Sequence, residues 1–230
     1  IESLAIRDSS PSRTTHHESQ PEQPRRYNYS MSIKSQMINY PINAHSTPGY
    51  LAQPDDDANA LHPGVVVIQE WWGLVPHIKD VADRFAREGF VALAPDLYHG
   101  QAADEHDEAR KLAMALDANR AVQEIAAAAR YLKNQPNVAP KKVGTVGWCM
   151  GGGLSLSTAA HHADLIGAAI AFYGRPLSAS DTAKLQVPVL GLYAEHDHGI
   201  PVAAVKAFED ELKAHHIQHE IHIYAGADHA

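Results

Sequence analysis

The most reactive side chain in this sequence is a single cysteine between two glycines. Cys149 is the only cysteine among 230 residues, and Gly147 and Gly151 lie two positions before and after it. It follows the run 142–146, whose β-branched residues predict a strand. A sharp turn from a strand into a helix strains its central residue, and glycines two positions away leave room for the backbone. The spacing predicts an exposed nucleophile. The alternative is a buried cysteine that acts as a small hydrophobe.

A cysteine attacks as a thiolate, so it needs a base, and the base needs an acid that orients it. Asp197 follows the predicted strand 187–193, and His229 follows the predicted strand 220–224. Both come after the cysteine, in the order nucleophile, acid, histidine that triads at the end of a parallel sheet show. The sequence therefore predicts a triad of Cys149, Asp197 and His229.

Each partner alone also has an ordinary interpretation. An aspartate before a helix is often a turn former, and most of the 16 histidines must lie on the surface. Glu195, His196, His198 and Asp228 lie beside the two candidates and could take their places. We favour Asp197 because it precedes a helix that a proline opens four residues later. The two histidines at 196 and 198 could indicate zinc, but their surroundings favour a loop, and we expect no metal.

Composition limits the class of protein. The chain has 45% hydrophobic and 20% charged residues and a formal net charge of −8, which is typical of a globular protein and argues against nucleic acid as a partner. No internal disulfide can form, and no apolar stretch approaches the roughly 18 residues of a membrane span. We expect a cytoplasmic monomer or weak homodimer that needs no cofactor and no membrane.

Residues 1–30 differ from the rest of the chain. They are rich in Ser, Thr, Pro, Gln, Arg and His and lack apolar periodicity, which predicts a disordered N-terminal extension. Residues 31–230 are predicted to form a single domain. Because the sequence stops one residue after His229, we expect that this domain lacks its last C-terminal segment.

From about residue 35, short β-branched runs alternate with helical stretches. This pattern predicts an α/β fold with a mostly parallel central sheet and helices on both faces. The predicted strands are 36–41 and 49–53, antiparallel at one edge, followed by 65–69, 90–94, 142–147, 166–173, 187–193 and 220–224. The predicted helices are 77–88, 104–134 with a break at Asp117, 149–160 and 201–215.

Several separated blocks resemble the dienelactone hydrolase family, the cysteine branch of the α/β-hydrolases. The match covers roughly residues 35–229, with blocks at 69–73, 94–98, 147–152, the Asp197 loop and 226–229. The resemblance implies an α/β-hydrolase fold and a hydrolase that cleaves a lactone or activated ester through a thioester on Cys149. It also implies that the backbone N–H groups of Trp71 and Met150 form the oxyanion hole.

The resemblance implies a further role for Glu70. In the family, a glutamate at this place lies beside the resting thiol, and substrate binding displaces it. A carboxylate next to sulfur disfavours a second negative charge, which would keep Cys149 neutral until it is needed. The alternative is that Glu70 only caps its loop, although a carboxylate at the end of a buried strand is uncommon without a task.

The sequence departs from the family where the substrate would bind. Family members that open dienelactone hold its carboxylate partly with an arginine two residues after the tyrosine at position 98, where this chain has Gly100. The departure argues against selectivity for an anionic lactone. We expect Trp72, Tyr98 and Trp148, together with Trp71, to line an apolar pocket for another lactone or activated ester.

Two rival functions stay open. A catalytically silent protein could keep the fold and use the pocket to bind a small molecule. The glycine run 151–153 could instead be a phosphate-binding loop of a nucleotide protein, but the lysine that such a loop needs is missing.

Overall fold

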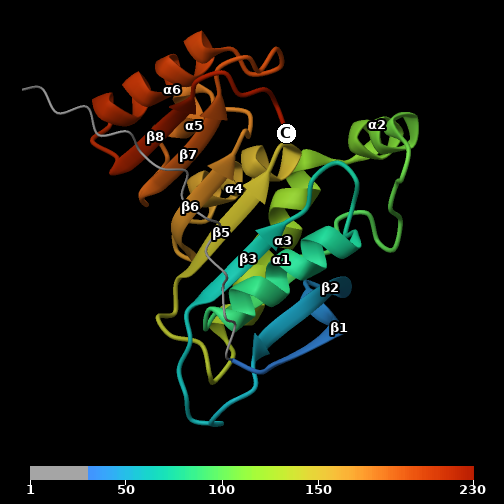
Figure 1. Cartoon of the computed structure of the whole chain (residues 1–230). Coiled ribbons are helices and arrows are strands. Elements are labelled where there is room, and N and C mark those ends of the chain that lie inside the picture. Colours follow the sequence, from blue (N-terminus) through green and yellow to red (C-terminus); the bar gives the residue numbers. More distant parts are fainter. Residues whose placement is uncertain (1–30) are drawn as a thin grey trace, which may run out of the picture.

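An eight-stranded sheet runs through residues 31–230, the part of the chain that the computed structural model describes (Figure 1). The predicted disorder of residues 1–30 lies outside this part. The strand order is β1-β2-β4-β3-β5-β6-β7-β8. The strands are β1 (Ile33–Ile42), β2 (His45–Pro54), β3 (Gly64–Ile68), β4 (Val91–Pro95), β5 (Val143–Trp148), β6 (Ile166–Phe172), β7 (Val189–Ala194) and β8 (His219–Tyr224).

The sheet is parallel except at one edge. β1 pairs antiparallel with β2, and β2 pairs antiparallel with β4, whereas every pairing from β4 through β8 is parallel. The predicted mostly parallel sheet with an antiparallel edge is therefore confirmed. The carboxyl ends of the parallel strands all meet at the same edge, so loops that are far apart in sequence become neighbours there.

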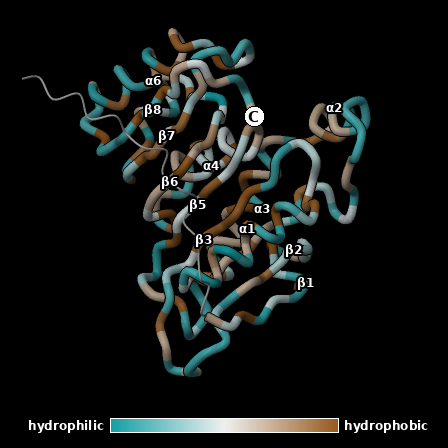
Figure 2. Tube along the Cα trace, in the orientation of Figure 1, coloured by the Kyte–Doolittle hydropathy of each residue, from teal (hydrophilic) through white to brown (hydrophobic). Residues whose placement is uncertain are grey.

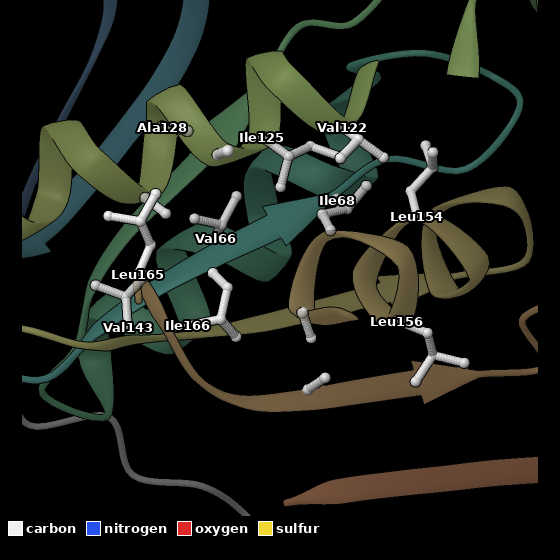
Figure 3. Close-up of a cluster of buried hydrophobic side chains, with 14 of the residues drawn as sticks. Val66, Ile68, Val122, Ile125, Ala128, Val143, Leu154, Leu156, Leu165 and Ile166 are labelled. Atoms are coloured by element: carbon white, nitrogen blue, oxygen red, sulfur yellow. The ribbon is translucent and has the colours of Figure 1, made fainter. Parts of the chain in front are cut away.

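Helices cover both faces of the sheet. They are α1 (Pro76–Arg87), α2 (His106–Ala115), α3 (Ala118–Lys133), α4 (Met150–His161), α5 (Ala179–Thr182) and α6 (Val202–Ala214). Val66 and Ile68 of β3 pack in one hydrophobic cluster with α3 and α4 (Figure 3), while Val65 and Val67 pack in another with α1. Because successive strand residues point to opposite faces, a strand covered on both sides must be apolar throughout. β3 is brown along its length in Figure 2 for this reason.

Local sequence explains where the helices begin. Asp117 caps α3, because its Oδ1 accepts hydrogen bonds from the backbone N–H groups of Asn119 at 2.9 Å and Arg120 at 3.2 Å. This cap confirms the predicted break in the helical stretch 104–134. α5 has four residues, too few for an apolar period, and it was not predicted. In the described residues, no helix is long and apolar enough to cross a membrane.

Candidate active site

Cys149 lies at the sharp turn between β5 and α4. Its backbone angles, φ 53° and ψ −117°, fall in a region that residues other than glycine rarely adopt. A Cβ at Gly147 would lie 2.2 Å from the carbonyl oxygen of Gly151, and one at Gly151 would lie 2.4 Å from that of Gln69. Glycine is therefore required at both positions. The turn leaves the Cys149 side chain partly exposed at the carboxyl edge of the sheet.

A continuous chain of contacts joins the three residues of the predicted triad. His229 Nε2 lies 3.2 Å from Cys149 Sγ, and His229 Nδ1 lies 2.6 Å from Asp197 Oδ2. The other oxygen of Asp197 accepts hydrogen bonds from the backbone N–H groups of Gly199 at 2.8 Å and Ile200 at 3.0 Å. These bonds fix the carboxylate, and the carboxylate in turn fixes the imidazole. The chain end marked C in Figure 1 lies beside the start of α4, consistent with this contact.

The carboxyl group of Asp197 is held as an anion. Burial is the largest influence on its pKa and raises it, but the hydrogen bonds from His229, Gly199 and Ile200 together outweigh burial and lower the pKa below the usual range. The neighbouring candidate Glu195 has a different role, because its Oε2 accepts a hydrogen bond from Gly226 N–H at 2.8 Å. It ties the two loops together, whereas the ring nitrogens of His229 bond Asp197 and contact Cys149.

The thiol of Cys149 is held in its neutral form. Burial raises its pKa most, and the negative charges of Glu70 and Asp197 raise it further. The backbone N–H of Met150 acts in the opposite direction, because it hydrogen-bonds the sulfur and favours the thiolate. This N–H is the one predicted to bind an oxyanion, and its place at the start of α4 suits a negative charge.

Glu70 lies two residues after β3 and contacts a residue that sequence reasoning missed. The Tyr173 hydroxyl donates to Glu70 Oε1 at 3.4 Å, and its ring packs edge-on against His229 with centroids 4.9 Å apart. Burial and the nearby Glu70 raise the pKa of Tyr173, which keeps the hydroxyl protonated and able to donate. Tyr173 comes directly after β6, so the rule that selected the triad from strand exits could have found it.

Tyr98 fixes the backbone next to the predicted oxyanion donor. Its hydroxyl donates to the carbonyl oxygen of Trp71 at 3.1 Å and lies 3.8 Å from the sulfur of Met150. Burial raises the pKa of Tyr98 to about 12, so the donor stays protonated. Trp72 packs edge-on against Trp71, with centroids 5.1 Å apart.

A cavity of about 580 Å³ opens around the cysteine, and we call it the Cys149 cavity. Its lining includes Cys149, His229, Trp71, Met150 and Tyr173.

The other three predicted pocket residues do not line this cavity. Trp72 packs on the ring of Trp71, and Tyr98 hydrogen-bonds its carbonyl oxygen. Trp148 stacks on Phe172, with centroids 5.3 Å apart, and both border a separate cavity of about 700 Å³ on the α1 side of the sheet. Trp148 points away from the cysteine because adjacent residues at the end of a strand project to opposite faces.

Comparison with known proteins identifies the relatives of this chain. Residues 47–230 match the model of the dienelactone hydrolase family. "Protein usf" of Aquifex pyrophilus is 38% identical over 202 residues, covering 85% of this chain and 86% of that protein. A protein of Aquifex aeolicus named "Putative carboxymethylenebutenolidase" is 34% identical over 203 residues, covering 85% and 86%.

Solved structures give the same result. A Klebsiella pneumoniae protein described as "Putative Dienelactone Hydrolase" superposes with a TM-score of 0.78 at 29% identity, covering 86% of this chain and 88% of the other. The predicted resemblance and the predicted α/β-hydrolase fold are confirmed by these matches, and the protein is a hydrolase.

Proposed function

This chain belongs to the dienelactone hydrolase family, and we propose that it cleaves a lactone or an activated ester through a thioester formed on Cys149. The observation that carries the proposal is the uninterrupted line from Asp197 through His229 to the sulfur, with contacts of 2.6 Å and 3.2 Å. A nucleophile, a base in contact with it and an acid that orients the base are the parts that covalent acyl transfer needs.

In the first half of the reaction, His229 Nε2 takes the thiol proton, and the thiolate of Cys149 attacks the carbonyl carbon of the substrate. The carbonyl oxygen becomes an oxyanion, which the N–H groups of Met150 and Trp71 stabilise. When the oxyanion collapses, the bond to the leaving alkoxide breaks, and His229 gives its proton to that oxygen. The acyl group is then held as a thioester.

In the second half, a water molecule gives a proton to His229 and attacks the thioester carbonyl. Collapse of the second oxyanion breaks the carbon–sulfur bond and releases the acid, and His229 returns its proton to the departing thiolate, which restores the thiol. A thiolate leaves an addition intermediate more readily than an amide nitrogen does, so esters and lactones suit this site better than peptides.

Glu70 keeps the resting enzyme protected in this scheme. Its charge helps to hold the thiol neutral, and a substrate that displaces the carboxylate from the sulfur removes that restraint. The thiolate then forms when an ester is present to react with it.

The test is turnover of short activated esters and lactones by the wild type, Cys149→Ala and Cys149→Ser. We expect Cys149→Ala to lose turnover and the wild type to show a covalent acyl adduct by intact mass, mapped to residue 149. Cys149→Ser should change the substrate preference and the stability of the adduct. Unchanged turnover by Cys149→Ala, or an adduct on another residue, would refute the mechanism. A protein that binds ligands without cleaving them is the alternative that these outcomes would favour.

A further inference from the structure

A second cavity lies next to the Cys149 cavity. It has a volume of about 530 Å³ and lies between the loop that follows β6 and the first turns of α6, and we call it the distal cavity. Its lining is Arg175, Pro176, Leu177, Ala179, Gly199, Ile200, Pro201, Ala204, Ala207, Phe208 and Glu211. Five of these residues also line the Cys149 cavity: Arg175, Pro176, Leu177, Gly199 and Ile200. The two spaces therefore share a wall formed by two loops.

The distal cavity is suited to an apolar group. Ile200 and Phe208 are 8% and 2% exposed and form its most buried part, and Leu177 packs against the main hydrophobic cluster. On α6 the lining residues are 204, 207, 208 and 211, which lie on one face of a helix. Ala204 and Ala207 are exposed, and their small side chains leave the space beside the helix unfilled.

The shared wall can accommodate a chain that crosses it. Gly199 contributes no side chain, and a Cβ there would meet only Asp197 Oδ1, at 3.4 Å. Arg175 forms no ion pair or hydrogen bond with its side chain in residues 31–230. An arginine stem can lie along an apolar chain while its head stays in water.

We propose that the distal cavity binds the apolar chain of an extended ester whose carbonyl group lies at Cys149. The inference rests on the proposed function and narrows it, because it makes chain length the property that the site selects. The group that the distal cavity binds is an unbranched hydrocarbon chain. This chain can belong to either the acyl side or the alcohol side of the ester. Two observations carry it: continuity with the Cys149 cavity, and a lining that is apolar apart from Arg175 and Glu211.

Chain length should then determine kcat/KM. A fully buried methylene contributes about a threefold to fourfold gain in binding, and a partly buried one contributes less. Between a four-carbon and an eight-carbon chain we expect kcat/KM to rise at least about tenfold.

The experiment compares p-nitrophenyl esters from acetate to decanoate, and in parallel a series of alkyl acetates that places the chain on the alcohol side. The proteins are the wild type, Ala207→Phe and Ala203→Phe. Residue 203 is exposed on the same helix and does not line the distal cavity, so Ala203→Phe controls for the substitution itself. Ala204→Phe is a second cavity-filling variant in case Ala207→Phe does not fold, and thermal unfolding checks each protein.

We expect the wild type and Ala203→Phe to prefer the long chain in one of the two series. In the p-nitrophenyl ester series, Ala207→Phe or Ala204→Phe should lower the ratio of kcat/KM for octanoate to that for acetate at least fivefold relative to the wild type. If the alkyl acetate series shows the length preference instead, the ratio for octyl acetate to methyl acetate should fall by the same factor. Absence of a length preference in both wild-type series would overturn the inference, as would an equal preference in the filled and control variants. p-Nitrophenyl acetate and methyl acetate carry no long chain to bind, so their cleavage through Cys149 reports the proposed function separately.

Discussion

Glu70 and Tyr173 are joined by a hydrogen bond of 3.4 Å. They follow β3 and β6, the two strands that flank β5, and Cys149 follows β5 itself. The carboxylate, the thiol and the phenol therefore come from three neighbouring strand ends. The same tyrosine ring packs against His229, so one residue contacts both the carboxylate that we propose restrains the thiol and the imidazole that we propose deprotonates it.

The first prediction concerns Glu70→Gln. Burial raises the pKa of Cys149 most and the negative charge of Glu70 raises it further, so removing that charge should lower the pKa. Below the pKa, each unit of decrease raises the thiolate fraction about tenfold, and we expect alkylation by iodoacetamide at pH 7 to become about fivefold faster or more. The measurement is the alkylation rate from pH 6 to 10, whose midpoint should move to lower pH.

Glu88→Gln is the matched control for this prediction, because it removes an exposed carboxylate on the C-terminal side of α1. Its alkylation profile should coincide with that of the wild type. A Glu70→Gln profile with the wild-type midpoint would show that this carboxylate does not restrain the thiol.

The second prediction concerns Tyr173→Phe. The variant keeps the ring beside His229 but loses the hydroxyl that donates to Glu70. The hydroxyl positions the Glu70 carboxylate, so without it the carboxylate is free to turn toward solvent and its charge raises the Cys149 pKa less. The alkylation midpoint should therefore again move to lower pH, by less than in Glu70→Gln. In the double variant the tyrosine change should add nothing, because its effect acts through Glu70. If the shifts of the alkylation midpoint in the two single variants add in the double variant, Tyr173 does not act through Glu70.

The third prediction concerns Asp197→Asn. An amide can still bond His229 Nδ1, but it favours the wrong tautomer and cannot stabilise the imidazolium, so kcat should fall about 10³-fold to 10⁴-fold. Asp228→Asn is the control, because this exposed aspartate precedes His229 directly and should change kcat less than about threefold. Equal losses in the two variants would remove Asp197 from the triad.

The same variant tests the pH dependence of stability. The pKa of Asp197 is depressed in the folded protein, so its ionised form contributes stability above the unfolded pKa, and that contribution is lost as the pH falls through the folded pKa. The wild type should therefore lose more stability than Asp197→Asn when the pH falls from 5 to 3. Urea unfolding across this interval measures the difference, and parallel curves would contradict it.

Much of this site follows from the sequence because strand exits can be located along the chain. The glycines at 147 and 151 indicate the turn, and parallel strands bring their carboxyl ends together, so the sequence predicts that Asp197 and His229 lie near Cys149. The choice between Glu195 and Asp197 depended on a helix opened by a proline. The structure gives its physical basis, since Asp197 bonds the backbone of that loop.

What the sequence could not give was the direction of side chains around the cysteine. Trp148 is adjacent to Cys149 in sequence, but one step along a strand reverses the face, and it packs on the α1 side. Tyr98 lies in a recognisable block, yet its role as a support for Trp71 depends on a contact across 27 residues. The Cys149 cavity and the distal cavity are formed by loops, and no local sequence pattern encodes the relative positions of these loops.

The last prediction concerns the turn itself. In Gly147→Ala the new methyl group would lie 2.2 Å from the carbonyl oxygen of Gly151, so the backbone of the turn must move. We expect a loss of about 2–4 kcal/mol of unfolding free energy and a large loss of turnover, because the shift displaces Cys149 from the imidazole.

Gly153→Ala is the control in the following helix, where a Cβ would meet Arg175 at an ordinary 3.5 Å. It should be neutral or stabilise by up to about 1 kcal/mol, since alanine favours a helix. Urea unfolding compares the two variants, and equal stability would show that the turn does not require glycine at 147.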